Sequence, residues 1–264
     1  MFLYIMFRKN ISEIIFIMVI FILLVSCSSH KSLANLPSGV KWERAEDFYN
    51  REKFNKAIPY YQQLIFERSS IYTADAQYKL GECYFNTKKY IDAIFEYQEL
   101  LRLFPDNLLA ADAQYRIGEA YVKLSLKPDL TQEDSQRAID NFERFLEKYP
   151  QDNRKSEALK HITDMQIKQI EKTFKNGYIY FKIKDYPASQ LYLSEIIELG
   201  NHNELEKKSV YYNAIIHIDR KEAADALNSI DHLKTYFPES KELKTAEKRF
   251  KRMNSWFWRM VYFY

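Results

Sequence analysis

Five histidines and two cysteines are the side chains of this chain best suited to act as nucleophiles, proton-transfer groups or metal ligands. The histidines belong to no HExxH motif and to no other metal-ligand pair at helical spacing; they are His30, His161, His202, His217 and His232. The chain also has no glycine-rich phosphate loop and no G-x-S-x-G turn, and its many carboxylates are scattered over predicted helix surfaces. We therefore predict no enzyme activity, no catalytic residue, no metal site and no cofactor, and we expect His217 to be a packed core residue.

The first cysteine follows a short apolar segment. Residues 24–27 are Leu-Val-Ser-Cys, and an uncharged run of twelve residues from Ile14 to Val25 lies behind the basic pair at 8–9. A membrane span needs about 20 apolar residues, so residues 1–26 are predicted to be a cleaved signal peptide. The segment resembles bacterial lipoprotein signals, which implies that Cys27 becomes the first mature residue and carries acyl chains on its sulfur and amino group. The alternatives are an uncleaved anchor and a chance Ser-Cys pair.

Composition narrows the class of the mature chain. The signal contains two of the 39 basic and one of the 36 acidic residues, which leaves 37 and 35, a formal charge of +2. This balance argues against nucleic-acid binding, which needs a clustered basic excess. Only five glycines and seven prolines occur in 264 residues, which favours helices over a sandwich or barrel. Lipidation of Cys27 leaves Cys83 alone, and a lone thiol in a helical pattern is predicted to be a small buried hydrophobe.

Two segments of the chain are nearly identical: residues 73–82 (TADAQYKLGE) and residues 110–119 (AADAQYRIGE). Each begins a copy of the Leu-Gly, Tyr, Ala, Phe/Tyr, Pro pattern of the 34-residue tetratricopeptide repeat. The first copy has Leu80-Gly81, Tyr84, Ala93, Tyr97 and Pro105, and the second has Ile117-Gly118, Tyr121, Ala138, Phe142 and Pro150. Weaker copies are centred on Ala57, Ser189 and Ala226. The prediction is an all-α, superhelical α-solenoid of about five tetratricopeptide-like helix pairs.

Uneven spacing between the repeats suggests where the chain departs from a regular stack. Eight extra residues lie near residues 126–129, followed by a helix-start box at 131–134, and residues 156–176 read as one long helix in which we place a hinge. The expected domains are a signal at 1–26, a lipidated linker at 27–40, repeats one to three at 41–152, repeats four and five at 153–250, and a basic-aromatic tail at 251–264. The tail suits either a membrane interface or a partner groove, or it belongs to a capping helix.

In such a stack the first helix of each repeat lines the concave face. The aromatic residues predicted there are Trp42, Tyr49, Tyr78, Phe85 and Tyr115. Aromatic rings flanked by carboxylates suit an extended peptide with apolar or aromatic side chains. The alternative is that Tyr78 and Tyr115 pack against the next helix.

A lipoprotein signal followed by five irregular repeats resembles the BamD family of the outer-membrane β-barrel assembly machinery. The shared features are Cys27 near the first repeat, the helix ends at 57–61 and 100–105, the lengthened third repeat and the long helix. The resemblance implies a lipid-anchored scaffold on the periplasmic face of the outer membrane. It further implies that the C-terminal repeats bind the POTRA-bearing barrel insertase and that the N-terminal repeats receive unfolded outer-membrane proteins. The missing proline of the fourth repeat and the aromatic tail depart from the family pattern.

Two other classes compete with this interpretation. A periplasmic repeat protein of the Tol-Pal or cell-division type is expected to have an N-terminal coiled coil and no lipid-modified cysteine. A glycan-binding repeat lipoprotein is expected to be roughly twice as long as this chain.

Overall fold

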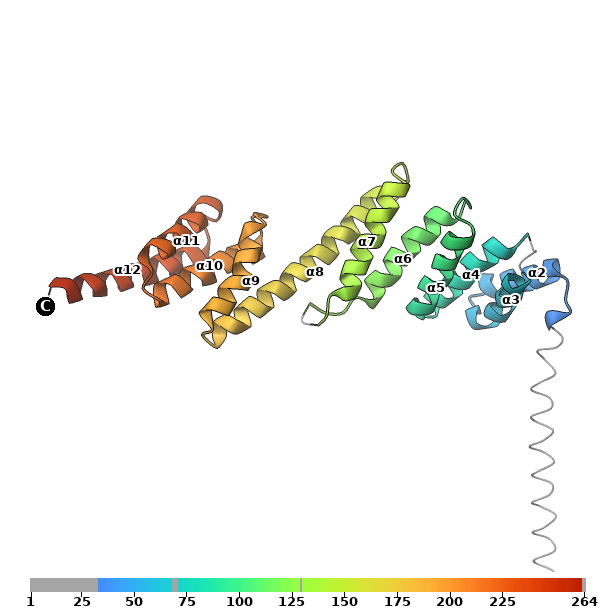
Figure 1. Cartoon of the computed structure of the whole chain (residues 1–264), viewed down its shortest axis with the longest axis horizontal. Coiled ribbons are helices and arrows are strands. Elements are labelled where there is room, and N and C mark those ends of the chain that lie inside the picture. The colour runs from blue at the N-terminus through green and yellow to red at the C-terminus, as the bar shows by residue number, and fades with distance from the viewer. Residues whose placement is uncertain (1–32, 68–70, 129, 263–264) are drawn as a thin grey trace, which may run out of the picture. The chain divides into compact units, whose positions relative to one another are not determined.

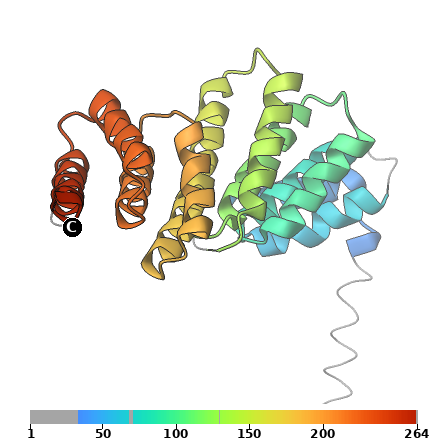
Figure 2. The ribbon, with the colours of Figure 1, turned by 60° about the vertical axis from the view of Figure 1, so that its left-hand side comes forward.

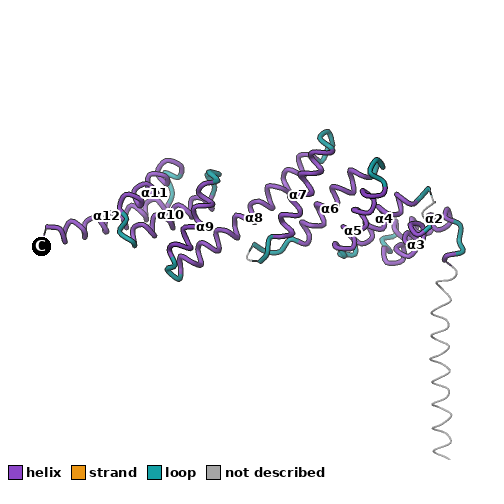
Figure 3. Tube along the Cα trace, in the orientation of Figure 1, coloured by secondary structure: helices purple, strands orange, loops and turns teal. Residues whose placement is uncertain are grey.

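The structure is a computed structural model that describes residues 33–67, 71–128 and 130–262. Cys27 and the predicted signal peptide lie outside these residues. The described residues form α-helices joined by short loops, with no strand among them (Figures 1 and 3). In chain order the helices are α2 (Ser38–Asn50), α3 (Phe54–Phe66), α4 (Thr73–Asn86), α5 (Tyr90–Leu103), α6 (Ala110–Leu124), α7 (Glu133–Lys148), α8 (Lys155–Lys182), α9 (Tyr186–Glu198), α10 (Glu204–Asp219), α11 (Ala223–Tyr236) and α12 (Lys241–Tyr262). The all-α prediction and the five successive helix pairs are confirmed. No described helix combines the length and apolar character that a membrane span requires.

The second helix of every pair buries three side chains at the same spacing of four and then three residues. A small residue comes first and two larger ones follow on the same helix face. The triplets are Ala57, Tyr61 and Leu64; Ala93, Tyr97 and Leu100; Ala138, Phe142 and Phe145; Ser189, Leu193 and Ile196; and Ala226, Ile230 and Leu233. Each of these residues is at most 4% exposed, so the weak first, fourth and fifth copies have the same buried triplet as the two strong ones.

Glycine marks the place where the two helices of a pair approach most closely. A Cβ atom added to Gly81 of α4 would lie 2.5 Å from a ring carbon of Tyr97 on α5. At the equivalent Gly177 of α8, the nearest atom is the flexible Cδ2 of Leu193 on α9, at 3.0 Å. The predicted register of glycine against a bulky partner is therefore found in both pairs.

The turn inside a pair is also repeated. Lys88, Lys184 and Lys221 have φ angles of 62°, 63° and 64°, and Glu52 has 55°, each two residues before the second helix. At the first of these turns, the Lys88 N–H donates to the Phe85 carbonyl (3.0 Å) and the following N–H to the Tyr84 carbonyl (2.9 Å). This is a Schellman motif, which satisfies the last carbonyls of the first helix.

The third pair lacks this short turn. Eight residues, 125–132, separate α6 from α7, against three between α4 and α5, and α7 begins at Glu133, inside the predicted helix-start box. Lysines of α8 hold the inserted loop: the Nζ of Lys168 donates to the hydroxyl of Ser125 (2.7 Å) and that of Lys172 donates to the carbonyl of Leu130 (2.6 Å). The predicted long helix is confirmed as α8, which has 28 residues.

The chain divides into two compact units. The first unit contains residues 1–123 and 144–151, and the second contains residues 124–143 and 152–264, so α7 contributes to both. In the first unit, α2, α3 and α4 share a core around Tyr61 and Leu80. In the second unit, α12 packs against α10 and α11 through Leu243 and Ala246 (Figure 2). This packing supports the capping-helix interpretation for the residues from Lys241 to Ser255.

Candidate functional site

The first helices of the first unit present a continuous row of rings and charges. On α2 and α4, the ammonium of Lys79 lies 4.0 Å from the ring centroid of Tyr49 and 3.8 Å from a carboxylate oxygen of Glu46. Glu46 also accepts a 2.6 Å hydrogen bond from the hydroxyl of Tyr61 on α3. Burial raises the pKa of Tyr49 to about 12, so its hydroxyl stays protonated as a hydrogen-bond donor.

Glu82 is the buried centre of this row. The guanidinium of Arg116 on α6 donates two hydrogen bonds to the Glu82 carboxylate, from Nε to Oε1 at 2.9 Å and from Nη2 to Oε2 at 3.0 Å. The hydroxyl of Tyr97 also donates to this carboxylate. The same guanidinium binds Glu119 at 2.9 Å and lies 5.0 Å from the ring centroid of Phe85. A bidentate pair with a stacked ring fixes Arg116 in one orientation.

We call this surface the aromatic-charged face. It is defined by side chains of α2, α4 and α6, namely Glu46, Tyr49, Lys79, Glu82, Phe85 and Arg116. The exposed fraction of the Arg116 side chain is 32%, against 7% for Glu82. The positive and negative side chains of this face balance each other, and the buried carboxylate of Glu82 holds the face rigid. Its rings and cations are partly exposed to solvent.

Four of the five aromatic residues predicted to bind a peptide are half-buried, namely Trp42, Tyr49, Tyr78 and Phe85. Trp42 stacks on Tyr72 at a centroid distance of 5.1 Å, Tyr49 meets Phe54 edge to face at 5.5 Å, and Phe85 meets Tyr90 in the same way at 5.4 Å. Each ring keeps an accessible part while its other side is packed. Partly packed rings lose little side-chain entropy when a ligand covers them.

The two tyrosines from the near-identical segments differ in burial. Tyr115 is only 4% exposed and packs against Phe145 with ring centroids 5.2 Å apart. It belongs to the core beneath α6 and not to an accessible surface. Tyr78 is half-buried beside Tyr97, at 5.6 Å, and burial raises its pKa. Packing on the second helix is thus the main role of Tyr115 and part of the role of Tyr78.

Cys83 lies under the same face. Its side chain is 0% exposed, and burial raises the pKa of the thiol to about 12. A thiol that stays protonated is neither a nucleophile nor a metal ligand. The prediction of a small buried hydrophobe is confirmed.

A groove between α3, α4 and α5 was not found by sequence reasoning. It has a volume of about 730 Å³ and includes the exposed apolar side chains of Phe95 and Leu103, which are 59% and 47% exposed. Gln77 donates its amide to Glu96 inside the groove, and burial raises the pKa of that carboxyl to about 7. In the sequence, the groove is indicated by Phe95 and Leu103, which are apolar although they lie on the exposed side of α5.

The helix pairs and their close glycine contacts define an α-helical repeat protein. Residues 74–107 and residues 112–152 match models of the tetratricopeptide repeat, so these two segments are repeats of that type. Tetratricopeptide repeats form scaffolds for protein-protein interaction. No curated protein matches the chain.

Several solved structures are similar to the chain at low identity. The second tetratricopeptide repeat domain of human RPAP3, solved with an HSP70 peptide, is 19% identical, with 48% of this chain and 92% of that chain covered and a TM-score of 0.38. A repeat protein from Bacteroides fragilis is 13% identical, with coverages of 82% and 99% and a TM-score of 0.44. One from Parabacteroides merdae is also 13% identical, with coverages of 83% and 73% and a TM-score of 0.36.

Proposed function

We propose that the protein is a non-catalytic scaffold lipoprotein of the machinery that assembles β-barrel proteins in the outer membrane. In this proposal the aromatic-charged face receives an extended segment of an unfolded barrel precursor. The observation that carries the proposal is the row of half-buried rings, Tyr49 and Phe85, set between the fixed cations Lys79 and Arg116.

The chemistry of the face suits an extended peptide. Rings that are already packed on one side offer apolar area at low entropic cost to aromatic side chains of a ligand. Lys79 and Arg116, which pair with Glu46 and Glu119, would also donate hydrogen bonds to a terminal carboxylate, and the two glutamates would accept hydrogen bonds from the backbone N–H groups of the peptide. A barrel strand that ends in an aromatic residue has all three of these features. Affinity in the micromolar range is expected, because the peptide is ordered on binding.

The other parts of the proposal rest on the sequence. The signal-like segment and Cys27 support a lipid anchor in the outer membrane, and the resemblance to the BamD family implies a place beside the POTRA-bearing insertase. We assign the insertase contact to the second unit, as the family resemblance implies. Replacing Cys27 with Ala should release the protein from the membrane fraction. A wild-type protein found in the inner-membrane fraction of a density gradient would contradict the location.

A binding experiment tests the aromatic-charged face directly. A labelled peptide copying an aromatic-ended barrel strand is titrated with the protein, and anisotropy gives the Kd. The double change Tyr49→Ala with Phe85→Ala should weaken binding at least tenfold, which corresponds to about 1.4 kcal/mol.

The matched control removes apolar side chains from the groove instead. Phe95→Ala with Leu103→Ala also deletes an aromatic and another large apolar side chain from the first unit, and it should leave the Kd unchanged. Thermal melts of both variants show whether the repeats stay folded. Loss of peptide binding in the control alone would show that the peptide binds in the groove and not on the aromatic-charged face. Binding of an oligosaccharide, with no binding of any barrel peptide, would favour the glycan-binding class.

A further inference from the structure

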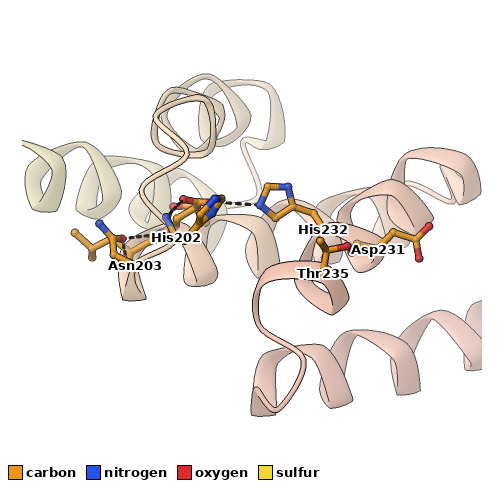
Figure 4. Close-up of polar contacts among 8 residues, drawn as sticks. His202, Asn203, Asp231, His232 and Thr235 are labelled. Atoms are coloured by element: carbon orange, nitrogen blue, oxygen red, sulfur yellow. Dashed lines mark hydrogen bonds and ion pairs between the residues drawn. The ribbon is translucent and has the colours of Figure 1, made fainter.

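Two histidines and a buried carboxylate converge where α10 begins. Glu206 of α10 is 0% exposed, and its Oε1 lies 3.3 Å from the Nδ1 of His202 and 2.9 Å from the Nε2 of His232 on α11. Figure 4 shows the imidazole of His232 directed toward His202 across the dashed contacts. The three ligand atoms all lie within 4.8 Å of one another.

We propose that His202, Glu206 and His232 form a binding site for one divalent transition-metal ion, best suited to Zn²⁺. Two imidazole nitrogens and one carboxylate oxygen are a ligand set that zinc takes in proteins, with water or a further ligand in the fourth position. Bond lengths of about 2.0–2.1 Å in a tetrahedron place neighbouring ligand atoms about 3.3 Å apart. The His202 nitrogen lies 3.3 Å from the Glu206 oxygen and the His232 nitrogen lies 2.9 Å from it, and the two nitrogens are within 4.8 Å of each other, so side-chain movements bring the three atoms around one ion.

The surroundings hold the ligands in place. The second oxygen of Glu206 accepts a 2.6 Å hydrogen bond from the backbone N–H of His202, and Asn203 caps the helix through the N–H groups of Leu205 and Glu206. The ring of Tyr236 stacks on the imidazole of His202 at a centroid distance of 4.0 Å. Such contacts outside the ligand set fix ligand orientation and raise metal affinity.

The backbone of the site is unusual as well. His202 has a φ of 49°, in the left-handed region, and it follows Gly200 with a φ of 59°. The other left-handed residues of this structure that are not glycine occupy the repeated turns inside helix pairs, whereas His202 lies in the loop between α9 and α10. This conformation brings the imidazole back over the first turn of α10, onto Glu206.

Charge and access are suitable for a cation. In the described part of the chain, the basic groups that contact Glu206 are the two imidazoles, which bind metals in their neutral form. The side chain of His202 is 47% exposed, so an ion reaches the site from solvent. A second cluster, His217 with Glu222 and Asp225, has one imidazole, and Arg220 lies 2.9 Å from Glu222. That guanidinium repels a cation, which makes this cluster the natural comparison.

Metal titration of the full chain tests the proposal. Metal-free protein is titrated with Zn²⁺ by calorimetry, with elemental analysis after dialysis, and one bound ion per chain is expected. Mg²⁺ should not compete, because it prefers oxygen ligands. Bound Co²⁺ should give the visible absorption of a tetrahedral site. Zinc should also raise the melting temperature, because it binds the folded chain.

Three variants assign the ligands. His202→Asn keeps a residue that tolerates the left-handed backbone, Glu206→Gln keeps hydrogen-bond acceptance for the imidazoles, and His232→Gln keeps a donor to Glu206. Each should weaken zinc binding at least about 10- to 100-fold, the effect of losing even an orienting partner. The control His217→Asn should bind zinc like the wild type. Unchanged zinc binding in the three variants, or loss only in the control, would overturn the assignment, as would an absence of zinc binding by the wild type.

Discussion

The two units each contain a buried carboxylate on the first helix of a pair, but they compensate it in different ways. In the first unit, Glu82 of α4 is held by the guanidinium of Arg116 and the hydroxyl of Tyr97. In the second unit, Glu206 of α10 is held by the imidazoles of His202 and His232. Arginine stays charged at every physiological pH, whereas a neutral imidazole can bind a metal ion through its unprotonated ring nitrogen. A buried carboxylate on a first helix thus belongs to a permanent ion pair in one unit and to an exchangeable ligand set in the other.

The largest effect is expected where the permanent ion pair is broken. Arg116→Met leaves the carboxylate of Glu82 buried without its cation and should lower the free energy of unfolding by about 2–4 kcal/mol, slightly less than a fully buried pair because Arg116 is 32% exposed. His232→Gln keeps a neutral donor beside Glu206 and should cost only about 1 kcal/mol in metal-free protein. Urea denaturation of both variants gives the two values. Equal losses of unfolding free energy in the two variants would mean that Arg116 and His232 stabilise their buried carboxylates equally.

The next effect compares the two glycine contacts. Gly81→Ala places a methyl group 2.5 Å from a ring carbon of Tyr97, whose side chain is 0% exposed. The overpacking should destabilise the first unit by about 1–3 kcal/mol. Gly177→Ala meets the Cδ2 of Leu193 at 3.0 Å and the Cβ of Tyr192 at 3.2 Å, which is a milder overlap, and it gains about 1 kcal/mol of helix propensity, so its melting temperature should stay near that of the wild type. A Gly81→Ala melt that matches wild type would show that the proposed register of α4 on α5 is wrong.

The smallest effect concerns a third carboxylate, which has only a neutral partner. Glu96 accepts from the amide of Gln77, and burial raises its pKa from 4.5 to about 7. Because the folded state holds the proton more tightly, this carboxyl stabilises the fold fully below pH about 4.5, and the contribution is lost as the pH rises to about 7. Glu96→Gln removes that dependence. Above pH 7 the variant should be more stable than wild type by on the order of 1 kcal/mol, since water enters the groove. If the free energies of unfolding of the wild type and of Glu96→Gln change with pH in parallel, the pKa of the Glu96 carboxyl is not raised.

Most of the fold follows from local patterns in the sequence. A small residue followed four and seven positions later by larger apolar residues marks the second helix of each pair, and glycine marks the close approach. These signals survive in the weak repeats, because packing between the paired helices requires them. The insertion before α7 and the long helix α8 could also be predicted, since residues 156–176 contain no proline or glycine.

The candidate sites were less predictable, because they depend on contacts between helices. Tyr78 and Tyr115 occupy the same place in nearly identical segments, but Tyr115 packs against Phe145 and is buried, whereas Tyr78 packs against Tyr97 and is half-buried. The zinc ligands were missed for a similar reason. His202 lies four residues before Glu206 but outside the helix, and His232 is 26 residues further along the chain on α11. The sequence signal for this site is a histidine four residues before a glutamate at a helix start, a pattern that differs from paired histidines.

Helix α7 is divided in its packing but continuous in its backbone. Residues up to Glu143 belong with the second unit, and the last turns, from Arg144, belong with the first. Helix formation is cooperative, so the backbone hydrogen bonds of one half of α7 support those of the other. Local opening at one end of α7 therefore frays the helix toward its other end, and amide exchange along α7 will show protection that falls in both halves together.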